Sequence, residues 1–339
     1  KSQGELFGGL SDNDPIPEWL QGGRKIPNVS GFEVPAYATF ADRARRHTGL
    51  SFVGAVRAGA DAYDRQFGIT ADLRLAPVSK VKPDSGSPFH GVALEGQLTL
   101  PLAWVLERDA KRYKIDGDKV RAYKKSTAFR TVIKLTGNKK NIENRLYYET
   151  DDGKWMRASS LNVARQPDEM PAAAKKGEKW IDISIDQQTL ILWEGSRPVY
   201  ATLVSTGQDR MGDPKTTKST VRGTFRIRAK HVTTVMDSAE GLGSKKEKDP
   251  EYGKTKRRGE GSFILQDVPW VQYFKDSYAL HAAYWHDVFG LPRSHGCVNL
   301  APIDAHRVFF WSSPNIPQGW HGVYVRGGED EGTVVYVHE

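Results

Sequence analysis

The stretch of this sequence best equipped for chemistry runs from Ala279 to Leu300 and reads ALHAAYWHDVFGLPRSHGCVNL. It gathers reactive and polar side chains in a short span, namely His281, His286, Asp287, Ser294, His295, Cys297 and Asn299. Acyl transfer through cysteine needs a thiolate, a base that generates it, donors for the oxyanion and a group that orients the base. These residue types at this spacing therefore predict a cysteine nucleophile with a histidine partner.

Cys297 is the only cysteine of the 339-residue chain. A lone cysteine excludes a disulfide within the chain, and it excludes zinc sites built from several cysteines. Because a free thiol has a pKa of about 8.5, a neighbouring histidine or other positive group must raise its thiolate fraction at neutral pH. Gly296 permits a tight turn in which backbone N–H groups face a bound carbonyl. We predict that Cys297 is the nucleophile, and the alternative is an inert buried thiol.

The other polar side chains of this stretch each have a structural alternative. His281 stands in an otherwise apolar segment, so it is either the base or a core histidine. His286 either lines the cleft or supports the structure around it. Ser294 and Asn299 serve either the chemistry or the turn, since both residue types hydrogen-bond nearby backbone.

Two aromatic residues, Tyr284 and Trp285, form either walls of the cleft or part of the core. A zinc site is a further alternative, with ligands drawn from His281, His286, Asp287, His295 and Cys297. The spacing of these residues matches neither an HExxH motif nor a paired-cysteine pattern. We therefore expect no metal and no cofactor.

Strands in the C-terminal half are expected to position these residues. The segment from Trp180 to Asp186 alternates apolar and polar residues, which predicts a half-buried strand with three isoleucines on one face. Further strand patterns lie at Thr189–Trp193, Val199–Ser205, Thr224–Arg228 and Ser262–Gln266. A helix is expected over Pro302–Trp311, because proline suits a first helical turn. The region is predicted to be mainly β with one or two helices.

Length and composition favour several domains. The 339 residues are 38% hydrophobic and 27% charged, which is typical of a globular chain with two or three domains. The expected order is an extended segment at 1–35, SH3-like modules at 36–85 and 90–165, a linker at 166–178, a catalytic domain at 179–327 and a C-terminal strand or tail at 328–339. Both modules are predicted to be small all-β barrels, and Asp152-Gly153 marks a hairpin in the second.

Charge bears on the partners of the chain. The net charge is +8, which favours polyanions. The basic residues are neither concentrated on one helix nor interleaved with aromatics, so we expect no nucleic acid and instead a peripheral contact with an anionic envelope polymer. The sequence shows no run of about 18 apolar residues that could span a membrane, and no apolar signal segment follows Lys1.

The string Ser294-His295-Gly296-Cys297-Val298-Asn299 resembles the signature of the L,D-transpeptidase catalytic domain, often called the YkuD-type domain. In that family a histidine precedes a Ser/Thr-x-Gly-Cys segment, and His281 stands at the corresponding place. The hairpin from Trp180 to Gly207 and the run Asn299-Leu300-Ala301-Pro302 before a helix also fit. The resemblance covers residues 178–327 and implies a β-sandwich-like catalytic fold, preceded here by the SH3-like modules.

The resemblance implies a peptidoglycan L,D-transpeptidase that acts on donor and acceptor stem peptides. Cys297 would displace D-Ala from a donor to give a thioester, and the amine of an acceptor would then form a 3→3 crosslink. His281 would be base and acid, held by a backbone carbonyl near Ala282. The N–H groups of Gly296 and Cys297, with His295 nearby, would stabilise the oxyanion. The expected substrate contacts are Ser294, Asn299, Trp285, Tyr284 and His286.

Other activities fit the same residues. Water in place of the acceptor amine would make an L,D-carboxypeptidase or a crosslink-cleaving hydrolase, and a decayed site would leave a non-catalytic wall-binding protein. The intact SHGC string disfavours the last of these. We expect a monomer that is exported to the periplasm or cell wall. Twelve residues separate His281 from Ser294, fewer than in many family members, which shortens one wall of the cleft. The segment 237–261 is either a lid or a surface insertion.

Overall fold

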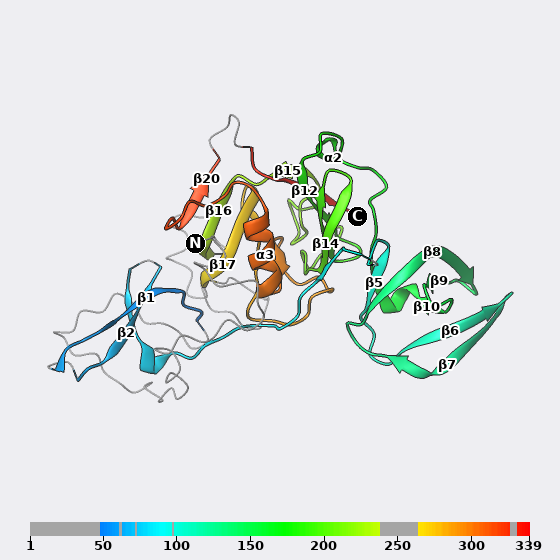
Figure 1. Cartoon of the computed structure of the whole chain (residues 1–339), viewed down its shortest axis with the longest axis horizontal. Coiled ribbons are helices and arrows are strands. Elements are labelled where there is room, and N and C mark those ends of the chain that lie inside the picture. Colours follow the sequence, from blue (N-terminus) through cyan, green and yellow to red (C-terminus); the bar gives the residue numbers. More distant parts are fainter. Residues whose placement is uncertain (1–47, 61–62, 72, 97, 238–263, 326–330) are drawn as a thin grey trace.

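The computed structural model describes residues 48–60, 63–71, 73–96, 98–237, 264–325 and 331–339 (Figure 1). The predicted extended segment at 1–35 lies outside the described residues, and so does nearly all of the segment 237–261. Strands dominate the described part, which also contains the helices α2 (Ala172–Lys175) and α3 (Pro302–Trp311). This confirms the mainly β fold class, and α3 has the predicted bounds. Within the described residues, no helix combines the length and apolar character that crossing a membrane requires.

The first module contains a small antiparallel sheet. Its strands are β1 (Phe52–Arg57), β2 (Gln66–Thr70) and β3 (Leu75–Pro77). The apolar stretch between Leu50 and Val56 lies largely in β1. An irregular run then leads past Ser87 to the next elements. The likeness of this module to an SH3 domain stays a prediction.

The second module is a seven-stranded antiparallel sheet in the order β11-β5-β8-β9-β10-β6-β7. Its strands are β5 (Leu102–Val105), β6 (Ala110–Asp116), β7 (Lys119–Thr127), β8 (Val132–Ile142), β9 (Arg145–Thr150), β10 (Trp155–Arg157) and β11 (Leu161–Ala164). The predicted turn at Asp152-Gly153 joins β9 to β10, and Gly153 has a φ of 73°. The likeness of this module to an SH3 domain also stays a prediction.

The C-terminal part is built on two sheets. The six-stranded sheet has the order β15 (Gly223–Arg226), β21 (Val334–His338), β12 (Lys179–Ser184), β13 (Thr189–Glu194), β14 (Arg197–Leu203) and β4 (Val92–Ala93). The five-stranded sheet has the order β19 (Val298–Leu300), β18 (Tyr278–Ala282), β17 (Ile264–Lys275), β16 (Ala229–Asp237) and β20 (Gly322–Tyr324). The edge strand β4 precedes β5, the first strand of the second module's sheet, so the chain visits the six-stranded sheet twice.

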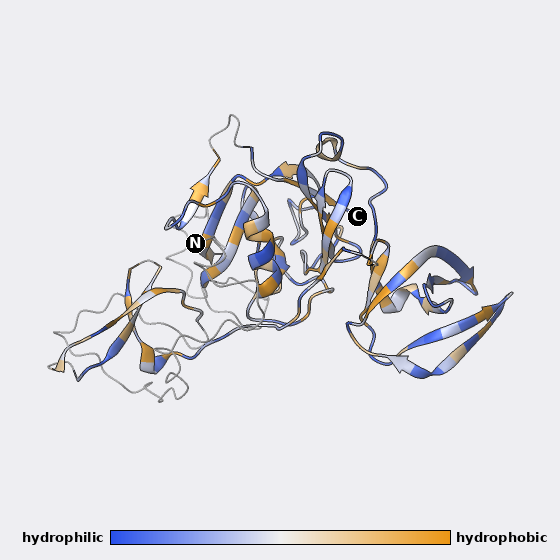
Figure 2. Ribbon diagram, viewed as in Figure 1, coloured by the Kyte–Doolittle hydropathy of each residue, from blue (hydrophilic) through white to orange (hydrophobic). Residues whose placement is uncertain are grey.

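One apolar core lies between the two sheets. It combines Ile181 and Ile183 of β12 with Leu280 of β18 and Val308 of α3, and all four are fully buried. Helix α3 packs against β17 and β18, and Figure 2 shows both hydrophobic and hydrophilic residues along it. Fully buried Asp304 of α3 accepts hydrogen bonds from β14, which fixes the helix to the other sheet.

The prediction that β12 is half-buried is wrong, because both faces of the strand are buried. Trp180 lies on the face opposite the isoleucines and stacks on Trp193 with ring centroids 5.0 Å apart. This face belongs to a second apolar core that also contains Leu102 and Trp104 of the second module. The alternation of apolar and polar residues in β12 could not reveal that this face is buried, because the residues that cover it come from a distant part of the chain.

Candidate active site

His281 and Cys297 lie on one face of the five-stranded sheet. Strands β18 and β19 pair in parallel with His281 opposite Asn299. Cys297 immediately precedes β19 and packs against the cluster that includes Ala279, which lies two residues before His281 on the same face of β18. The intervening residues Leu280 and Val298 point into the core between the sheets. The site therefore lies on the outer face of the sheet.

The thiol of Cys297 is neutral at rest. The residue is half-buried, and its Sγ donates a hydrogen bond to the Ser277 carbonyl at 3.6 Å. It packs against an apolar cluster that includes Val271 and Ala279. Burial raises the pKa of the thiol to about 11, although a hydrogen bond from the Ala279 backbone lowers it. The expected lowering of this pKa by a neighbouring positive group is therefore absent from the resting site.

The imidazole of His281 is also neutral. Its side chain is 3% exposed, and Nδ1 lies 3.0 Å from the Ala282 carbonyl oxygen. A carbonyl oxygen only accepts, so Nδ1 carries the proton and Nε2 keeps a lone pair. Burial lowers the pKa of His281 to about 4, against the opposing effect of the Ala282 carbonyl. The pair consists of an uncharged base and an uncharged thiol, and the orienting carbonyl lies where the sequence placed it.

The turn before Cys297 is held by side-chain hydrogen bonds. The Ser294 hydroxyl donates to the Cys297 carbonyl and accepts from the Gly296 N–H at 3.0 Å. Thr220 Oγ1 donates to the Gly296 carbonyl at 2.8 Å. The Gly296 amide donates within the turn in this resting site, and its role as an oxyanion donor stays a prediction. The Cys297 amide also stays a predicted donor, and Ser294 serves the turn.

Only glycine fits this turn at position 296. Gly296 has a φ of 130°, a region that side-chain-bearing residues rarely adopt. A Cβ there would lie 2.8 Å from the Tyr278 ring. The adjacent His295 is half-buried, and burial lowers its pKa to about 4, aided by Lys218 and opposed by Asp209. His295 is therefore a neutral neighbour of the nucleophile.

Asn299 and His286 support the site from within. Both are buried, and Asn299 Nδ2 lies 3.0 Å from His286 Nε2. The backbone of Asn299 also exchanges two hydrogen bonds of 2.9 Å with Ser205. The His286 ring packs against Phe289 with centroids 4.8 Å apart. These contacts favour the structural reading of both residues over direct contact with substrate.

The two predicted aromatic contacts, Tyr284 and Trp285, are half-buried. The Trp285 ring stacks on His281 with centroids 5.8 Å apart and an interplanar angle of 30°. It also packs against the cluster that contains Cys297, so it touches the surroundings of both catalytic candidates. The Tyr284 hydroxyl receives a hydrogen bond from the backbone of Gly49 in the first module.

Tyr278 and Ser277 belong to the site but were not predicted. Burial raises the pKa of Tyr278, and the nearby Cys297 raises it further. Its hydroxyl donates to the Pro214 carbonyl at 3.3 Å. No spacing in the sequence indicates Tyr278, because its contacts with Gly296 and Cys297 are made across the turn. Ser277 contributes only its backbone carbonyl, which no pattern of side chains can indicate.

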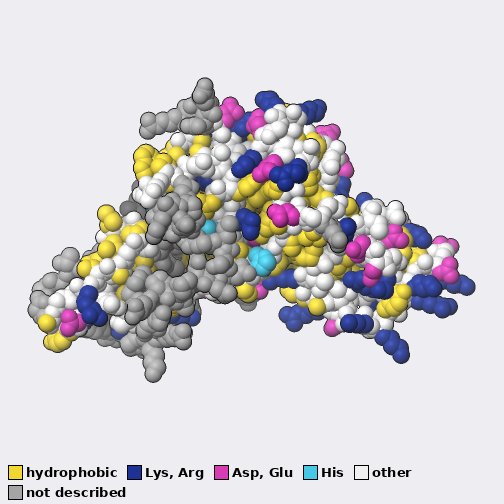
Figure 3. Space-filling view, viewed as in Figure 1, with side chains coloured by type: hydrophobic (Ala, Val, Ile, Leu, Met, Phe, Trp, Pro, Cys, Tyr) yellow, Lys and Arg dark blue, Asp and Glu magenta, His cyan; other side chains and the backbone are white. Residues whose placement is uncertain are grey.

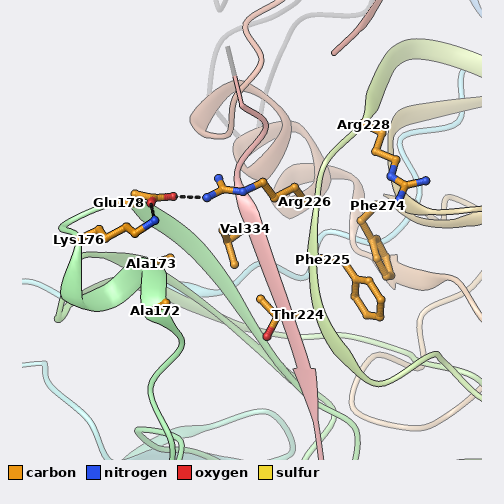
Figure 4. Close-up of a pocket in the computed structure, with 10 residues that line it drawn as sticks. All are labelled: Ala172, Ala173, Lys176, Glu178, Thr224, Phe225, Arg226, Arg228, Phe274 and Val334. Atoms are coloured by element: carbon orange, nitrogen blue, oxygen red, sulfur yellow. Dashed lines mark hydrogen bonds and ion pairs between the residues drawn. The ribbon is translucent and has the colours of Figure 1, made fainter. Parts of the chain in front are cut away.

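A groove of about 360 Å³ lies elsewhere, between α2 and β15. Figure 4 shows Arg226 reaching Glu178 across it, with Phe225 and Phe274 on the far side. Neither catalytic candidate lines this groove. Among the described residues, no three of the His, Cys, Asp and Glu side chains are grouped to hold a metal ion.

Residues 178–337 match the family model of YkuD, the L,D-transpeptidase catalytic domain. We call residues 178–337 the YkuD domain, after the family model that they match over slightly less than half of the chain. The chain is 28% identical over 144 residues to the putative L,D-transpeptidase YciB of Bacillus subtilis, covering 42% of this chain and 64% of that protein. It therefore spans slightly less than two thirds of that relative.

Solved structures similar to this chain include an L,D-transpeptidase from Stackebrandtia nassauensis, with 22% identity, a TM-score of 0.29 and coverage of 48% of this chain and 55% of that one. Another is an L,D-transpeptidase from Mycobacterium smegmatis, with 17% identity, a TM-score of 0.33 and coverage of 87% and 98%. At such TM-scores the likeness to these structures carries no argument, and the comparison used below is the match to the family model. The match to the family model runs to Val337 and includes most of β21.

Proposed function

We propose that the protein is a peptidoglycan L,D-transpeptidase that forms 3→3 crosslinks through a Cys297 thioester. The observation that carries this proposal is the packing of the sole thiol beside Ala279, which shares a face of β18 with His281, within the segment that matches the family model. The hydrogen bond from Nδ1 to the Ala282 carbonyl leaves Nε2 as the proton acceptor.

The reaction proceeds in two acyl transfers. His281 Nε2 accepts the thiol proton as sulfur attacks the donor carbonyl, and it returns that proton to the departing amine of D-Ala, which leaves a thioester. The acceptor amine then attacks the thioester and passes a proton through His281 to the leaving sulfur. Because the resting pair is neutral, charge develops only during attack, where the Cys297 amide can stabilise the oxyanion.

Incubation of the purified protein with a tetrapeptide stem and analysis of the products test this proposal. Crosslinked dimers with release of D-Ala support a transpeptidase. Tripeptide alone, with no dimer, would replace the proposal with an L,D-carboxypeptidase. Cleavage of a crosslinked dimer offered as substrate would replace it with a crosslink-cleaving hydrolase. Unchanged substrate points to a non-catalytic wall-binding protein. Cys297→Ala must remove the acyl-enzyme mass adduct, and an adduct that persists would end the proposal.

The location and partners follow from the same proposal. An enzyme acting on stem peptides belongs in the periplasm or cell wall, so we infer an exported monomer. Residues 90–165 contain 16 Lys and Arg against nine Asp and Glu, a net +7 of the +8 carried by the chain. This concentration supports contact of the second module, rather than of the YkuD domain, with an anionic envelope polymer.

A further inference from the structure

The loop of residues 283–293 connects the two catalytic candidates. It leaves β18 directly after His281 and Ala282, and it ends at Ser294, where the turn that holds Cys297 begins. The loop contains no regular strand or helix. Its side chains touch the site at two points, through the stack of Trp285 on His281 and the bond of His286 to Asn299.

This loop is held by residues that lie outside the YkuD domain. Ser87 Oγ donates to Asp287 Oδ1 at 2.6 Å, and Arg130 Nη1 forms an ion pair with the same oxygen at 2.7 Å. Arg130 Nη2 also donates to the Asp287 carbonyl at 3.3 Å. Asn162 Nδ2 donates to the Gly290 carbonyl at 2.8 Å. Three separate places in the preceding chain therefore converge on one short loop.

Apolar packing accompanies these polar contacts. Phe289 of the loop stacks on Phe89 with centroids 6.0 Å apart and an interplanar angle of 19°. The guanidinium of Arg130 lies 4.6 Å from the centroid of the same Phe89 ring. Phe289 and Ala283 belong to the apolar core that includes Trp104 of the second module. The second module and the loop are thus parts of one packed unit.

We propose that the second module is part of the active-site scaffold and that Arg130 is a positioning residue for the Cys297–His281 pair. Arg130 acts through Asp287, which holds the loop so that Trp285 covers His281 and the cluster around Cys297. Its side chain is 15% exposed and that of Asp287 is 52% exposed, so the enclosed guanidinium anchors the loop. Its bidentate grip on a side-chain and a backbone oxygen suits arginine better than lysine.

Cys297 provides a direct readout because no other residue of the chain carries a thiol. Alkylation by iodoacetamide, followed by intact mass between pH 6 and 11, reports the pKa and enclosure of this thiol without any substrate. In Arg130→Ala the loosened loop exposes the sulfur, so we expect alkylation at pH 8 to rise about tenfold while turnover of a tetrapeptide donor falls about tenfold. Arg130→Lys, which keeps the charge but not both contacts, should lie between the two. A rise in the alkylation rate together with a fall in turnover, both measured on variant protein shown to be folded by circular dichroism, distinguishes a positioning role from simple loss of folded protein.

Matched variants complete the experiment. Arg112→Ala removes an ion pair with Asp152 inside the second module and should leave both rates within twofold of wild type. Asp287→Asn weakens the pair from the loop side, which keeps the test valid if Arg130→Ala does not fold, and it should reproduce the alkylation effect.

The proposal rests on the proposed role of Cys297, yet the two can fail separately. Absent turnover in wild type together with faster alkylation of Arg130→Ala would reject the proposed activity and keep the positioning role. Alkylation and turnover of Arg130→Ala and Asp287→Asn equal to wild type would overturn the positioning role.

Discussion

The YkuD domain and the second module share one apolar core but distribute charge in opposite ways. Residues 178–337 contain 20 Lys and Arg against 19 Asp and Glu, a net +1, whereas residues 90–165 carry +7. The catalytic candidates are enclosed and neutral, with pKa values of about 4 for His281 and about 11 for Cys297. The difference teaches that the candidate site depends on burial and close packing. The charge that can attract anions over a distance lies mainly in the second module.

The charge of the second module gathers on the hairpin of β6 and β7. We define the basic hairpin as Lys114, Arg121, Lys124 and Lys125. Lys114 faces Arg121 directly across the two strands, and like charges opposite one another are destabilising. Figure 3 shows blue side chains crowding the end of the molecule that this module occupies in Figure 1. Such an arrangement lowers the free energy of unfolding of the module and is suited to binding an anionic partner.

The largest effect should come from enclosure in the YkuD domain. Gly296→Ala forces a side chain into a φ of 130° and against the Tyr278 ring, so we expect acyl-enzyme formation to fall at least about 100-fold. Stopped-time intact mass with a tetrapeptide donor measures it. Gly153→Ala is the control, because its φ is 73° but nothing lies within 4 Å of the added Cβ. Similar losses in both variants would contradict the role given to the turn.

Stability in the YkuD domain and in the second module should depend differently on acid pH. His281 has a pKa lowered from 6.5 to about 4, so its contribution to stability is present above pH 6.5 and is lost as pH falls to about 4, an effect of about 3 kcal/mol. Asp152 in the second module has a pKa lowered to about 2; burial raises it, but bonds from Lys154 and Thr150 prevail. Its contribution is lost only between pH 3.8 and 2.

Denaturant titrations at pH 7, 5 and 4 measure the free energy of unfolding for this comparison. His281→Gln should flatten the decline between pH 6.5 and 4, and Asp152→Asn should leave that decline unchanged. An equal slope in wild type and His281→Gln would show that the imidazole is not enclosed in the folded protein.

A smaller effect should follow from neutralising the basic hairpin. Replacing its four cations with glutamine should weaken binding to poly-glutamate about tenfold at low salt and reduce the salt dependence, while donor turnover stays unchanged. Equilibrium binding in a salt series measures this. The matched control replaces Lys175, Arg197, Arg222 and Lys275, which lie outside the second module. Equal weakening by both sets would mean that net charge alone matters.

The smallest effect tests the cost of the like-charged pair. Arg121→Glu places an acidic group opposite Lys114, so we expect the free energy of unfolding to rise by about 0.5 kcal/mol while poly-glutamate binding weakens. Urea titration and the same binding assay report the two effects. A loss of stability would show that Arg121 serves the fold.

The sequence was sufficient to predict a candidate site, but not how it is enclosed. The SHGC string, the lone thiol and His281 led to that candidate, because such residue types in a short span are chemically uncommon. Strand patterns and the bounds of α3 also followed from periodicity and proline. Tyr278 was missed, since its role depends on contact with Gly296 and Cys297 across a turn.

The raised pKa of the Cys297 thiol was not predicted, because burial of Cys297 arises from packing between segments and no local pattern encodes it. The contacts of Arg130 and Ser87 with the 283–293 loop span distances in sequence of 157 and 200 residues. Such distances in sequence explain why Asp287 was predicted only as a possible zinc ligand.

The strand β21 has a consequence for biogenesis. It inserts between β12, the first strand of the YkuD domain, and β15, and pairs in parallel with β12 over Trp180 to Ser184. A ribosome delivers residues in order, so the gap in this sheet stays open until residue 338 has emerged. Until then both flanking strands expose unpaired amides and carbonyls, which invites aggregation. The nascent chain should therefore depend on holdase chaperones until β21 has emerged, and truncation before Val334 should yield insoluble protein.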